Sequence, residues 1–571
     1  MTATEIRDLI LTTVSRNGGH LASSLGAVEI AMALAETFEP ERDRVVWDVG
    51  HQAYAWKILT GRADRFATLR KLDGISGFPS PLESAADAAV AGHAGVALSV
   101  AAGLAAARDR RGTDEQVVAV IGDASIVNGT SFEALNNCAA ATRKVIVVLN
   151  DNEMAISRPS GSFPKLLGRL IAGVRYNRVK NAAKKAGHAL RLSFLYGFVH
   201  WVKSRVKSLF LGNAFFEQFG LHYLGPVDGH DLAALKAAFK VAKESDRSVL
   251  VHVVTRKGHG FAPAEKHPTA WHGVGPFAYP PVIPAAPAAA AKRDWSAAFG
   301  AALTAAARRD ARVFALTAGM KDGTGLAGFA AEFPRRFLDV GIAEGHMMAF
   351  AAGLAAGGLR PVVAVYSTFL QRAIDQLAHD VCLASLPVVI CVDRAGAVGA
   401  DGATHQGVFD IALLRCLPNL TICQPKDEAD LASLVDEALR RNGPTVIRYP
   451  RGAVPAGEVV PLECAGAKTA IWATGDQVAK ANAVARLIGS AEVVHARYLK
   501  PFDAARLAAE RKAGMRIVSI ENGAVAGGFG EAIGADVKFG WPDRFIPHGT
   551  VAELERRYGF DEKAITEALN G

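Results

Sequence analysis

Asp123 and Asn152 are the two side chains whose types and spacing most clearly predict a chemical site. Asp123 comes directly after an apolar, β-branched run that ends at Gly122, and Asn152 follows a second such run at residues 145–149. A stretch with a helical pattern lies between them. Two neighbouring parallel strands are therefore expected to present a carboxylate and an amide oxygen at one edge of a sheet.

These oxygen atoms are hard ligands of the kind that Mg²⁺ prefers. A cation held by so few protein oxygens needs further ligands, and a diphosphate group supplies them. Gly122 allows the backbone to approach phosphates, and the N-terminus of a nearby helix favours their negative charge. A Gly-Asp pair alone is also typical of a turn in which Asp caps a helix. The second run, which ends in Asn150-Asp151-Asn152, favours the diphosphate–metal interpretation over the cap.

Glu344 is a third candidate, because its surroundings in the sequence are apolar. It lies between a predicted strand end and an apolar stretch with a helical pattern. A lone Glu is normally a surface residue, but the apolar neighbours of Glu344 make a solvent-exposed position less expected. The position therefore indicates a buried carboxyl group with a function.

The elements that must position these residues follow a regular order. Short β-branched runs alternate with Ala-rich amphipathic stretches along the chain. This alternation predicts an α/β fold of parallel sheets, in which ligands bind at the carboxyl ends of the strands. The clearest predicted strands are residues 117–121, 145–149, 362–366, 388–392 and 516–520.

Two breaks in composition divide the chain. Residues 276–291 are rich in Pro and Ala and predict an inter-domain linker, and a softer break lies near residues 452–467. We therefore expect three α/β domains, at residues 1–275, 292–452 and 466–571.

Composition and charge narrow the class of protein. Of the 571 residues, 50% are hydrophobic and 21% charged, which is typical of a soluble globular protein. The net charge of +8 suits anionic substrates, and neither zinc-finger spacing nor an aromatic–basic repeat supports nucleic-acid binding. A basic stretch at residues 165–207 is compatible with a membrane-surface or nucleic-acid helix, but a solvated insertion is the favoured interpretation.

The cysteines and the N-terminus indicate the compartment. The six cysteines contain no C-x-x-C pair and predict free thiols in a reducing environment. The first residues, MTATEIRDLI, lack the apolar core of a signal peptide, and no apolar run is long enough to span a membrane. We expect a cytoplasmic protein without a membrane partner.

The Asp123 and Asn152 pair resembles the thiamine-diphosphate motif, whose usual form is G-D-G…N. In that family the Asp, the Asn and a backbone carbonyl two residues later hold the metal. The resemblance therefore implies that Asp123, Asn152 and Met154 bind Mg²⁺. It also implies that Glu344 lies beside N1′ of the aminopyrimidine, where a carboxyl group favours the tautomer that removes the C2 proton of the thiazolium.

Longer strings resemble the 1-deoxy-D-xylulose-5-phosphate synthase family, within the transketolase-like group, over nearly the whole chain. They are GGHLASS, WDVGHQAY, YSTFLQRAIDQ, DRAGAVGADGATHQG, RYPRG and FIPHGT. The resemblance implies a homodimer of transketolase-like architecture, with thiamine diphosphate between a diphosphate-binding and a pyrimidine-binding domain. It also implies that the last domain packs the dimer rather than reacts. It also implies condensation of pyruvate with D-glyceraldehyde 3-phosphate to 1-deoxy-D-xylulose 5-phosphate and CO₂, for isoprenoid and thiamine synthesis.

The resemblance assigns roles to individual residues, although a single His or Arg is more often structural. From periodicity alone, Phe369 is better explained as a core aromatic. The implied catalytic residues are Glu344, His51, His405 and His20. The implied cofactor-binding residues are His51, His93, Gly122, Asp123, Ala124, Asn152, Glu344, Phe369 and Arg372. The implied substrate-binding residues are Tyr366, Arg372, Arg394, Asp401, His405, Arg451 and His272.

The chain departs from the family pattern at three places. Ala124 replaces the last Gly of G-D-G, and Gly345 replaces the Gln that follows Glu344. The family's G-H-S-S-T-S is GHAGVA here, starting at Gly92, so hydroxyl donors are missing. The metal ligands and Glu344 remain, so cofactor binding is still expected. The alternatives left open are a divergent paralogue, a transketolase-type ketol transfer with another donor or acceptor, and a non-catalytic relative that keeps the fold.

Overall fold

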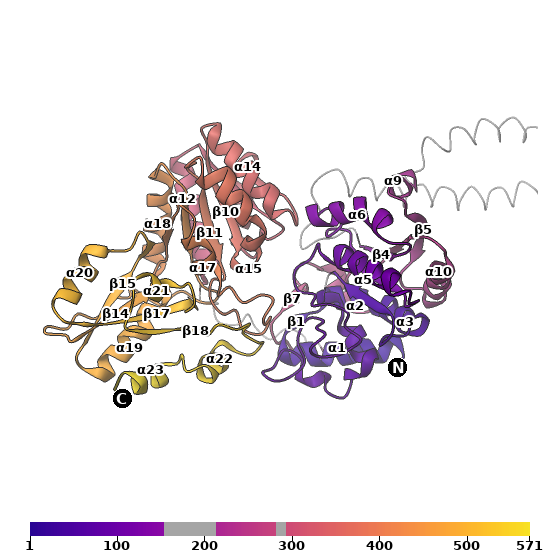
Figure 1. Ribbon diagram of the computed structural model, residues 1–571, viewed down its shortest axis with the longest axis horizontal. Coiled ribbons are helices and arrows are strands. Elements are labelled where there is room, and N and C mark those ends of the chain that lie inside the picture. Colours follow the sequence, from indigo (N-terminus) through magenta and orange to yellow (C-terminus); the bar gives the residue numbers. More distant parts are fainter. Residues whose placement is uncertain (49, 153–212, 281–292, 571) are drawn as a thin grey trace, which may run out of the picture. The chain divides into compact units, whose positions relative to one another are not determined.

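The computed structural model describes residues 1–48, 50–152, 213–280 and 293–570 (Figure 1). The chain forms two compact units. The first unit comprises Met1–Leu69 and Ile75–Pro280, and the second comprises Arg70–Gly74 and Pro281–Gly571. The basic stretch predicted at 165–207 lies outside the described residues, as does most of the predicted linker.

The first unit is built on a five-stranded parallel sheet in the order β2-β3-β4-β6-β5. Two further strands, β1 and β7, form a separate antiparallel pair. β3 and β4 are buried along their whole length, as expected for strands covered by helices on both faces. The strands are β1 (Gly19–His20), β2 (Arg44–Trp47), β3 (Val117–Gly122), β4 (Ile146–Asp151), β5 (His222–Asp228), β6 (Val249–Val254) and β7 (Gly273–Val274).

Helices cover both faces of this sheet, because successive side chains of each buried strand point to opposite sides. Val118 and Val120 belong to one apolar cluster with buried residues of α1, α3 and α10, whereas Ala119 and Ile121 belong to another with buried residues of α5 and α6. The helices of the first unit are α1 (Ala3–Asn17), α2 (Ala22–Gly26), α3 (Val28–Thr37), α4 (Tyr54–Lys57), α5 (Ala97–Arg111), α6 (Gly129–Ala141), α9 (Asn213–Gln218), α10 (Leu232–Glu244) and α11 (Ala262–Lys266).

The second unit contains two sheets. A seven-stranded sheet has the order β16-β12-β13-β11-β10-β8-β9, and a four-stranded parallel sheet has the order β15-β14-β17-β18. The strands of the first are β8 (Val313–Thr317), β9 (Phe337–Asp339), β10 (Arg360–Tyr366), β11 (Val389–Asp393), β12 (Thr421–Cys423), β13 (Thr445–Arg448) and β16 (Tyr498–Lys500). The strands of the second are β14 (Thr469–Thr474), β15 (Ala491–Ala496), β17 (Arg516–Ala524) and β18 (Val537–Trp541).

One strand from the last predicted domain links the two sheets of the second unit. β16 belongs to the last predicted domain, yet it pairs antiparallel with β12 at the edge of the seven-stranded sheet. The helices of this unit are α12 (Trp295–Arg309), α13 (Ala327–Glu332), α14 (Glu344–Ala356), α15 (Ser367–Leu370), α16 (Ile374–Gln376), α17 (Asp410–Arg415), α18 (Glu428–Arg440), α19 (Val478–Ile488), α20 (Ala504–Lys512), α21 (Phe529–Ala532), α22 (Val551–Arg557) and α23 (Glu562–Asn570).

The α/β class of parallel sheets predicted from the sequence is confirmed, and each of the five predicted strands overlaps an observed one. The limits of the three predicted domains stay predictions. All six cysteines are free thiols, of which four are buried. Among the described residues, none of the helices combines the length and apolar character that a membrane span requires.

Candidate functional site

The ends of β3 and β4 lie side by side, as the sequence predicts. The two strands are parallel, Gly122 is opposite Asn150, and the Asp123 amide donates to the Asn150 carbonyl at 3.2 Å. Asp123 and Asn152 therefore follow neighbouring strand ends in the first unit. The alternative role of Asp123 as a helix cap is wrong, because α6 begins at Gly129 and is capped by the Asn128 side chain.

Asp123 is buried among charged neighbours. Burial, together with the nearby Asp151 carboxylate, raises the pKa of Asp123 to about 7, while the Lys257 ammonium acts in the opposite direction. A divalent cation would offset the cost of burying this carboxylate. The carboxylate of Asp123 and the amide of Asn152 are thus a donor set that fits Mg²⁺. Met154, the third predicted ligand, lies outside the described residues.

Lys257 is a residue of this site that the sequence analysis missed. It is 6% exposed, and burial lowers its pKa to about 8 despite the neighbouring Asp123. It follows the carboxyl end of β6, which pairs directly with β4. The signal in the sequence was a lysine just beyond a β-branched strand. A buried ammonium beside a metal site fits the charge of a diphosphate.

The loop that carries His93 is held close to the Asp123 turn. Asp48 Oδ1 accepts hydrogen bonds from the amides of Gly95, Val96 and Ala97, at 2.8, 3.0 and 3.0 Å. Gly95 has a φ of 97°, and a Cβ there would lie 2.6 Å from Asn128 Cγ. The close approach therefore requires glycine. The buried Asp48 satisfies the amides at the start of α5, which helps to order the loop despite the missing hydroxyl groups.

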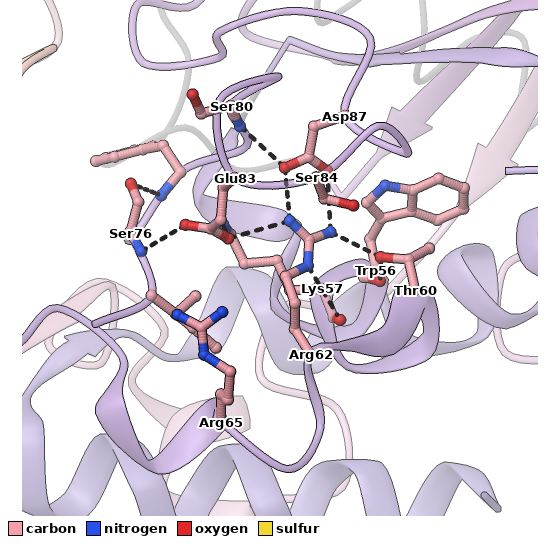
Figure 2. A network of polar contacts seen from close by, with 12 residues as sticks. Trp56, Lys57, Thr60, Arg62, Arg65, Ser76, Ser80, Glu83, Ser84 and Asp87 are labelled. Carbon is pink, nitrogen blue, oxygen red and sulfur yellow. Dashed lines mark hydrogen bonds and ion pairs between the residues drawn. The ribbon is translucent and has the colours of Figure 1, made fainter. Parts of the chain in front are cut away.

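A buried network fixes the segment that leads into this loop (Figure 2). Arg62 forms a two-pronged ion pair with Asp87, at 2.7 and 3.0 Å, and also donates to Glu83 at 3.0 Å. Lys57, which is fully buried, pairs with the same Glu83. The two carboxylates in turn accept from the backbone amides of residues 76 and 80, at 2.7 and 2.9 Å.

Three of the candidate residues, His20, His51 and His272, lie close together in the first unit. Their ring centroids are 5.1 Å apart for His20 and His51, 4.9 Å for His51 and His272, and 5.6 Å for His20 and His272. The β1–β7 pair places His20 opposite Gly273, next to His272. Burial, assisted by Lys257, holds the pKa of His272 well below its usual value. The His272 ring is therefore neutral near pH 7 and can donate one hydrogen bond and accept another.

A second cluster in the first unit has a structural explanation. Glu29, His230 and His259 offer ligand atoms within 4.8 Å of one another. Arg7 already donates to Glu29 at 2.7 Å, and His230 Nδ1 lies 3.2 Å from the same carboxylate. The remaining nitrogen of His230 accepts from the Arg256 amide at 2.8 Å. Both His230 nitrogens are thus satisfied by the protein itself, without a metal.

Glu344 begins α14 in the second unit and is 3% exposed. Its Oε2 atom lies 3.8 Å from Arg372 Nη1 and has no hydrogen-bond partner among the described residues. Burial raises the pKa of Glu344, whereas the Arg372 charge lowers it. A buried carboxyl oxygen without a hydrogen-bond partner among the described residues calls for a polar partner from outside the protein. The position therefore fits a ring nitrogen of a bound cofactor.

The altered position beside Glu344 is filled from another element. Gly345 replaces the expected Gln, and a Cβ at Gly345 would lie 3.0 Å from Gln376 Oε1 of α16. The Gln376 side chain thus occupies the space next to the start of α14. The departure at Gly345 removes a side chain from the helix but leaves a carboxamide nearby.

Tyr366, Phe369 and His405 form an aromatic wall in the second unit. The rings of Tyr366 and Phe369 stack at 5.8 Å, and the His405 ring meets Phe369 edge-on at 5.6 Å. Phe369 packs against the core but is only half-buried. The core role expected from periodicity therefore leaves part of the ring available to a ligand. Burial lowers the pKa of His405 to about 4, so its ring is neutral near pH 7.

Guanidinium groups surround Asp401 next to this wall. Arg394 lies over the Tyr366 ring, with Cζ 3.8 Å from its centroid. Arg451 Nη1 is 3.4 Å from Asp401 Oδ2, and Arg70 Nη1 donates to Asp401 Oδ1 at 2.6 Å. Arg70 was missed in the sequence analysis, because nothing in its local pattern connects it to Asp401. Two arginines against one carboxylate, with Arg394 on the neighbouring Tyr366 ring, leave a net positive charge that fits a phosphate.

Comparison with known protein families accounts for most of the chain. The family model described as 1-deoxy-D-xylulose-5-phosphate synthase matches residues 1–255. The models for the transketolase pyrimidine binding domain and the transketolase C-terminal domain match residues 291–456 and 458–565.

Curated relatives and solved structures extend the comparison. The 1-deoxy-D-xylulose-5-phosphate synthase 1 of Geobacter metallireducens is 44% identical over 600 residues, covering 99% of this chain and 95% of the relative. The synthase of Desulforudis audaxviator is 44% identical over 586 residues, covering 98% and 92%. The transketolase of Campylobacter jejuni is 18% identical, covers 99% of this chain and 98% of that one, and has a TM-score of 0.45. Since the identity to the two synthases runs over nearly their full length, this chain belongs to the 1-deoxy-D-xylulose-5-phosphate synthase family.

Proposed function

We propose that this chain condenses pyruvate with D-glyceraldehyde 3-phosphate to give 1-deoxy-D-xylulose 5-phosphate and CO₂. The product feeds isoprenoid and thiamine synthesis. The observation that carries the proposal is the 44% identity over 99% of the chain to relatives named for this synthase. The side chains support the proposal. The first unit offers a candidate metal site, and the second unit offers a buried acid and a cluster of cationic side chains.

The enzyme uses thiamine diphosphate with a divalent metal such as Mg²⁺, as the family and the match to a transketolase pyrimidine binding domain imply. When bound, this cofactor supplies an electron sink for charge that develops next to a carbonyl carbon. Asp123 and Asn152 would hold the metal, together with the Met154 carbonyl. Lys257 and His93 would neutralise and orient the diphosphate from the first unit.

The second unit would hold the ring end of the cofactor. The Oε2 atom of Glu344 would form a hydrogen bond with a ring nitrogen of the aminopyrimidine, and the half-buried ring of Phe369 would stack on that ring. Arg372, 3.8 Å from Glu344, keeps part of the negative charge on this carboxyl group. Since burial raises the pKa of Glu344, the group can hold a proton at Oε2 and share it with the ring nitrogen.

The substrates would meet two sets of polar groups. Tyr366, Arg394 and Arg451 would bind the phosphate of the aldehyde, with Asp401 holding Arg451 and the Tyr366 ring packing against Arg394. His405 is neutral near pH 7, so it suits a hydrogen bond to a carbonyl or hydroxyl group. His20, His51 and His272 would relay protons and bind the pyruvate carboxylate, because an imidazole ring can both donate and accept hydrogen bonds.

The remaining properties of the enzyme are proposed from the family. We infer a homodimer that works in the cytoplasm with Mg²⁺ as its metal. The three domain limits, 1–275, 292–452 and 466–571, are proposed as the borders of the diphosphate-binding, pyrimidine-binding and C-terminal domains. The absence of a membrane-spanning helix among the described residues is compatible with this assignment.

The proposed reaction is tested by incubating the protein with pyruvate, D-glyceraldehyde 3-phosphate, Mg²⁺ and thiamine diphosphate. We expect a 1-deoxyketose phosphate, identified by mass and NMR, together with one CO₂ for each product. A parallel reaction with a ketose phosphate as donor tests the transketolase alternative. Product from the ketose donor without CO₂, or no product from either donor, would contradict the proposal.

A further inference from the structure

The four-stranded sheet of the second unit supports two segments of the candidate site. We define the C-terminal platform as residues 545–554, which contain the FIPHGT string and the start of α22. Ile546 and Leu554 of the platform are buried in the apolar core of this sheet. Leu72 and Ala397 pack against the same core. Leu72 belongs to the Arg70–Gly74 segment, and Ala397 to the loop that carries Asp401 and His405.

The Arg70–Gly74 segment, which belongs to the second unit, is bound to the platform by several contacts. His548 Nε2 lies 3.1 Å from the Gly74 carbonyl oxygen, and a Cβ at Gly549 would lie 3.1 Å from Leu72 Cδ1. Arg557, just beyond the platform, pairs with Asp73 through both of its terminal nitrogens. Arg70 and Asp73 have φ values of 66° and 60°. Non-glycine residues adopt this backbone only where the surroundings hold them.

The loop with Asp401 and His405 rests on the same platform. The Gln406 carboxamide is 2% exposed, and its oxygen accepts from the Val398 amide at 2.6 Å. Its nitrogen donates to the Pro547 carbonyl at 3.0 Å. A Cβ at Gly402 would lie 3.0 Å from His548 Cβ. His548 therefore touches the Asp401 loop with its Cβ and the Arg70 segment with its ring.

The two segments that carry Arg70 and Asp401 thus both pack against the C-terminal platform. We propose that His548 is a positioning residue, which sets the geometry of Arg70 and Asp401 and thereby the affinity for the phosphate of the acceptor substrate. The C-terminal domain was expected from the sequence only to pack a dimer. This inference adds a role in acceptor recognition, and it rests on the proposed function.

The variant that isolates the hydrogen bond is His548→Phe, because phenylalanine keeps a ring of similar size but cannot donate to Gly74. We expect its KM for D-glyceraldehyde 3-phosphate to rise about fivefold to tenfold, the equivalent of one hydrogen bond. The KM for pyruvate is expected to stay within about twofold. His548→Gln keeps a donor at a comparable reach and is expected to recover most of the affinity.

Activity with unphosphorylated D-glyceraldehyde as the acceptor distinguishes a positioning role of His548 from a general loss of folded structure. If His548 acts through the phosphate end of the site, His548→Phe leaves kcat/KM for this acceptor within about twofold of the wild type. Lys563→Ala is the matched control, because Lys563 lies on α23 with a side chain 83% exposed. It is expected to leave both acceptors unaffected. Equal losses with both acceptors, or a normal KM for the phosphorylated one, would overturn the proposal.

Amide hydrogen exchange of the protein without substrates gives a readout that is independent of turnover. The amides of Gly402 and His405 donate within their loop at 3.1 and 2.8 Å. We expect both to exchange faster in His548→Phe, because the loop loses a fixed support, while β3 and β4 exchange unchanged. If the wild type forms no 1-deoxyketose phosphate, the proposed function fails, and exchange still decides whether His548 orders this loop. Unchanged exchange at Gly402 and His405 would overturn the positioning role.

Discussion

Arg70 donates to Asp401 across 331 positions of sequence, with 2.6 Å between Nη1 and Oδ1. Both side chains are nearly buried, at 10% and 12% exposure. The second oxygen of Asp401 faces Arg451 at 3.4 Å, so one carboxylate is shared by two guanidinium groups. The carboxylate holds the two cations at fixed places without cancelling their combined charge. This arrangement suits an anion that enters from solvent.

Arg451 is the member of this cluster with the most accessible side chain, at 47% exposure. We predict that Arg451→Gln raises the KM for D-glyceraldehyde 3-phosphate roughly 10- to 100-fold, the range of one lost hydrogen bond to a charged group. The KM for pyruvate is expected to change little. Initial rates over a matrix of both substrate concentrations measure the two constants. A larger effect on pyruvate than on the aldehyde would remove Arg451 from the phosphate site.

Glu344 is predicted to be essential for turnover but not for folding. Glu344→Gln keeps the shape of the side chain and removes the acid, so we expect kcat to fall at least about 100-fold. The thermal midpoint is expected to stay equal or to rise, because a neutral amide costs less to bury than a carboxylate. Steady-state rates and thermal unfolding check the two parts. Wild-type activity in this variant would refute the proposed contact with the cofactor.

Asp123 is predicted to control the affinity for the divalent metal. Asp123→Asn replaces a charged ligand by a neutral one, so we expect the Mg²⁺ concentration for half-maximal activity to rise at least about tenfold. Removing the metal with a chelator is expected to abolish activity in both proteins, and added Mg²⁺ to restore it. A variant with the wild-type Mg²⁺ requirement would place the metal elsewhere.

Lys57 is predicted to stabilise the first unit through the network of Figure 2. Lys57→Met leaves Glu83 and Asp87 facing Arg62 alone, so we expect a loss of about 3–5 kcal/mol in the free energy of unfolding. The double variant Lys57→Met/Glu83→Gln restores charge balance and is expected to recover part of the loss. Lys236→Met is the control, because the Lys236–Glu36 pair is 47% and 43% exposed, and it should change stability by less than about 1 kcal/mol. Denaturant unfolding measures all three.

Glu521 is predicted to make stability depend on pH. It is fully buried on β17 and accepts from the Phe529 and Gly530 amides at 2.7 and 2.8 Å. Burial raises its pKa from 4.5 to about 7. The folded state therefore binds the proton more tightly than the unfolded state, and stability is lost as pH rises from about 4.5 through 7.

Glu521→Gln removes this titration. The free energy of unfolding of the variant minus that of the wild type is expected to increase between pH 4.5 and 7, by at most about 3 kcal/mol at 1.36 kcal/mol per pKa unit. Above pH 7.5 the difference is expected to level off. Unfolding midpoints at six or more pH values measure it. A difference that stays constant over this range would contradict the buried-acid assignment.

The local elements and the chemical groups that they carry were predictable from residue order alone. Apolar runs such as those of β3 and β4 must be buried, so their ends, with Asp123 and Asn152, were predictable as neighbours at one sheet edge. Glu344 was also predictable, because apolar residues flank it on both sides. These signals are local, since period and residue type set strands and helices before any long-range contact forms.

The contacts between residues far apart in the sequence became visible only in the folded chain. Three such contacts have no periodic signal in the sequence. They are the Arg70–Asp401 ion pair, the proximity of Lys257 to Asp123, and the packing of Leu72 and Ala397 against one apolar core. The same holds for β16, which joins the seven-stranded sheet from the far side of the last predicted domain boundary. Such contacts depend on how separate elements pack, and packing is fixed by shape and burial over the whole unit rather than by neighbours in sequence.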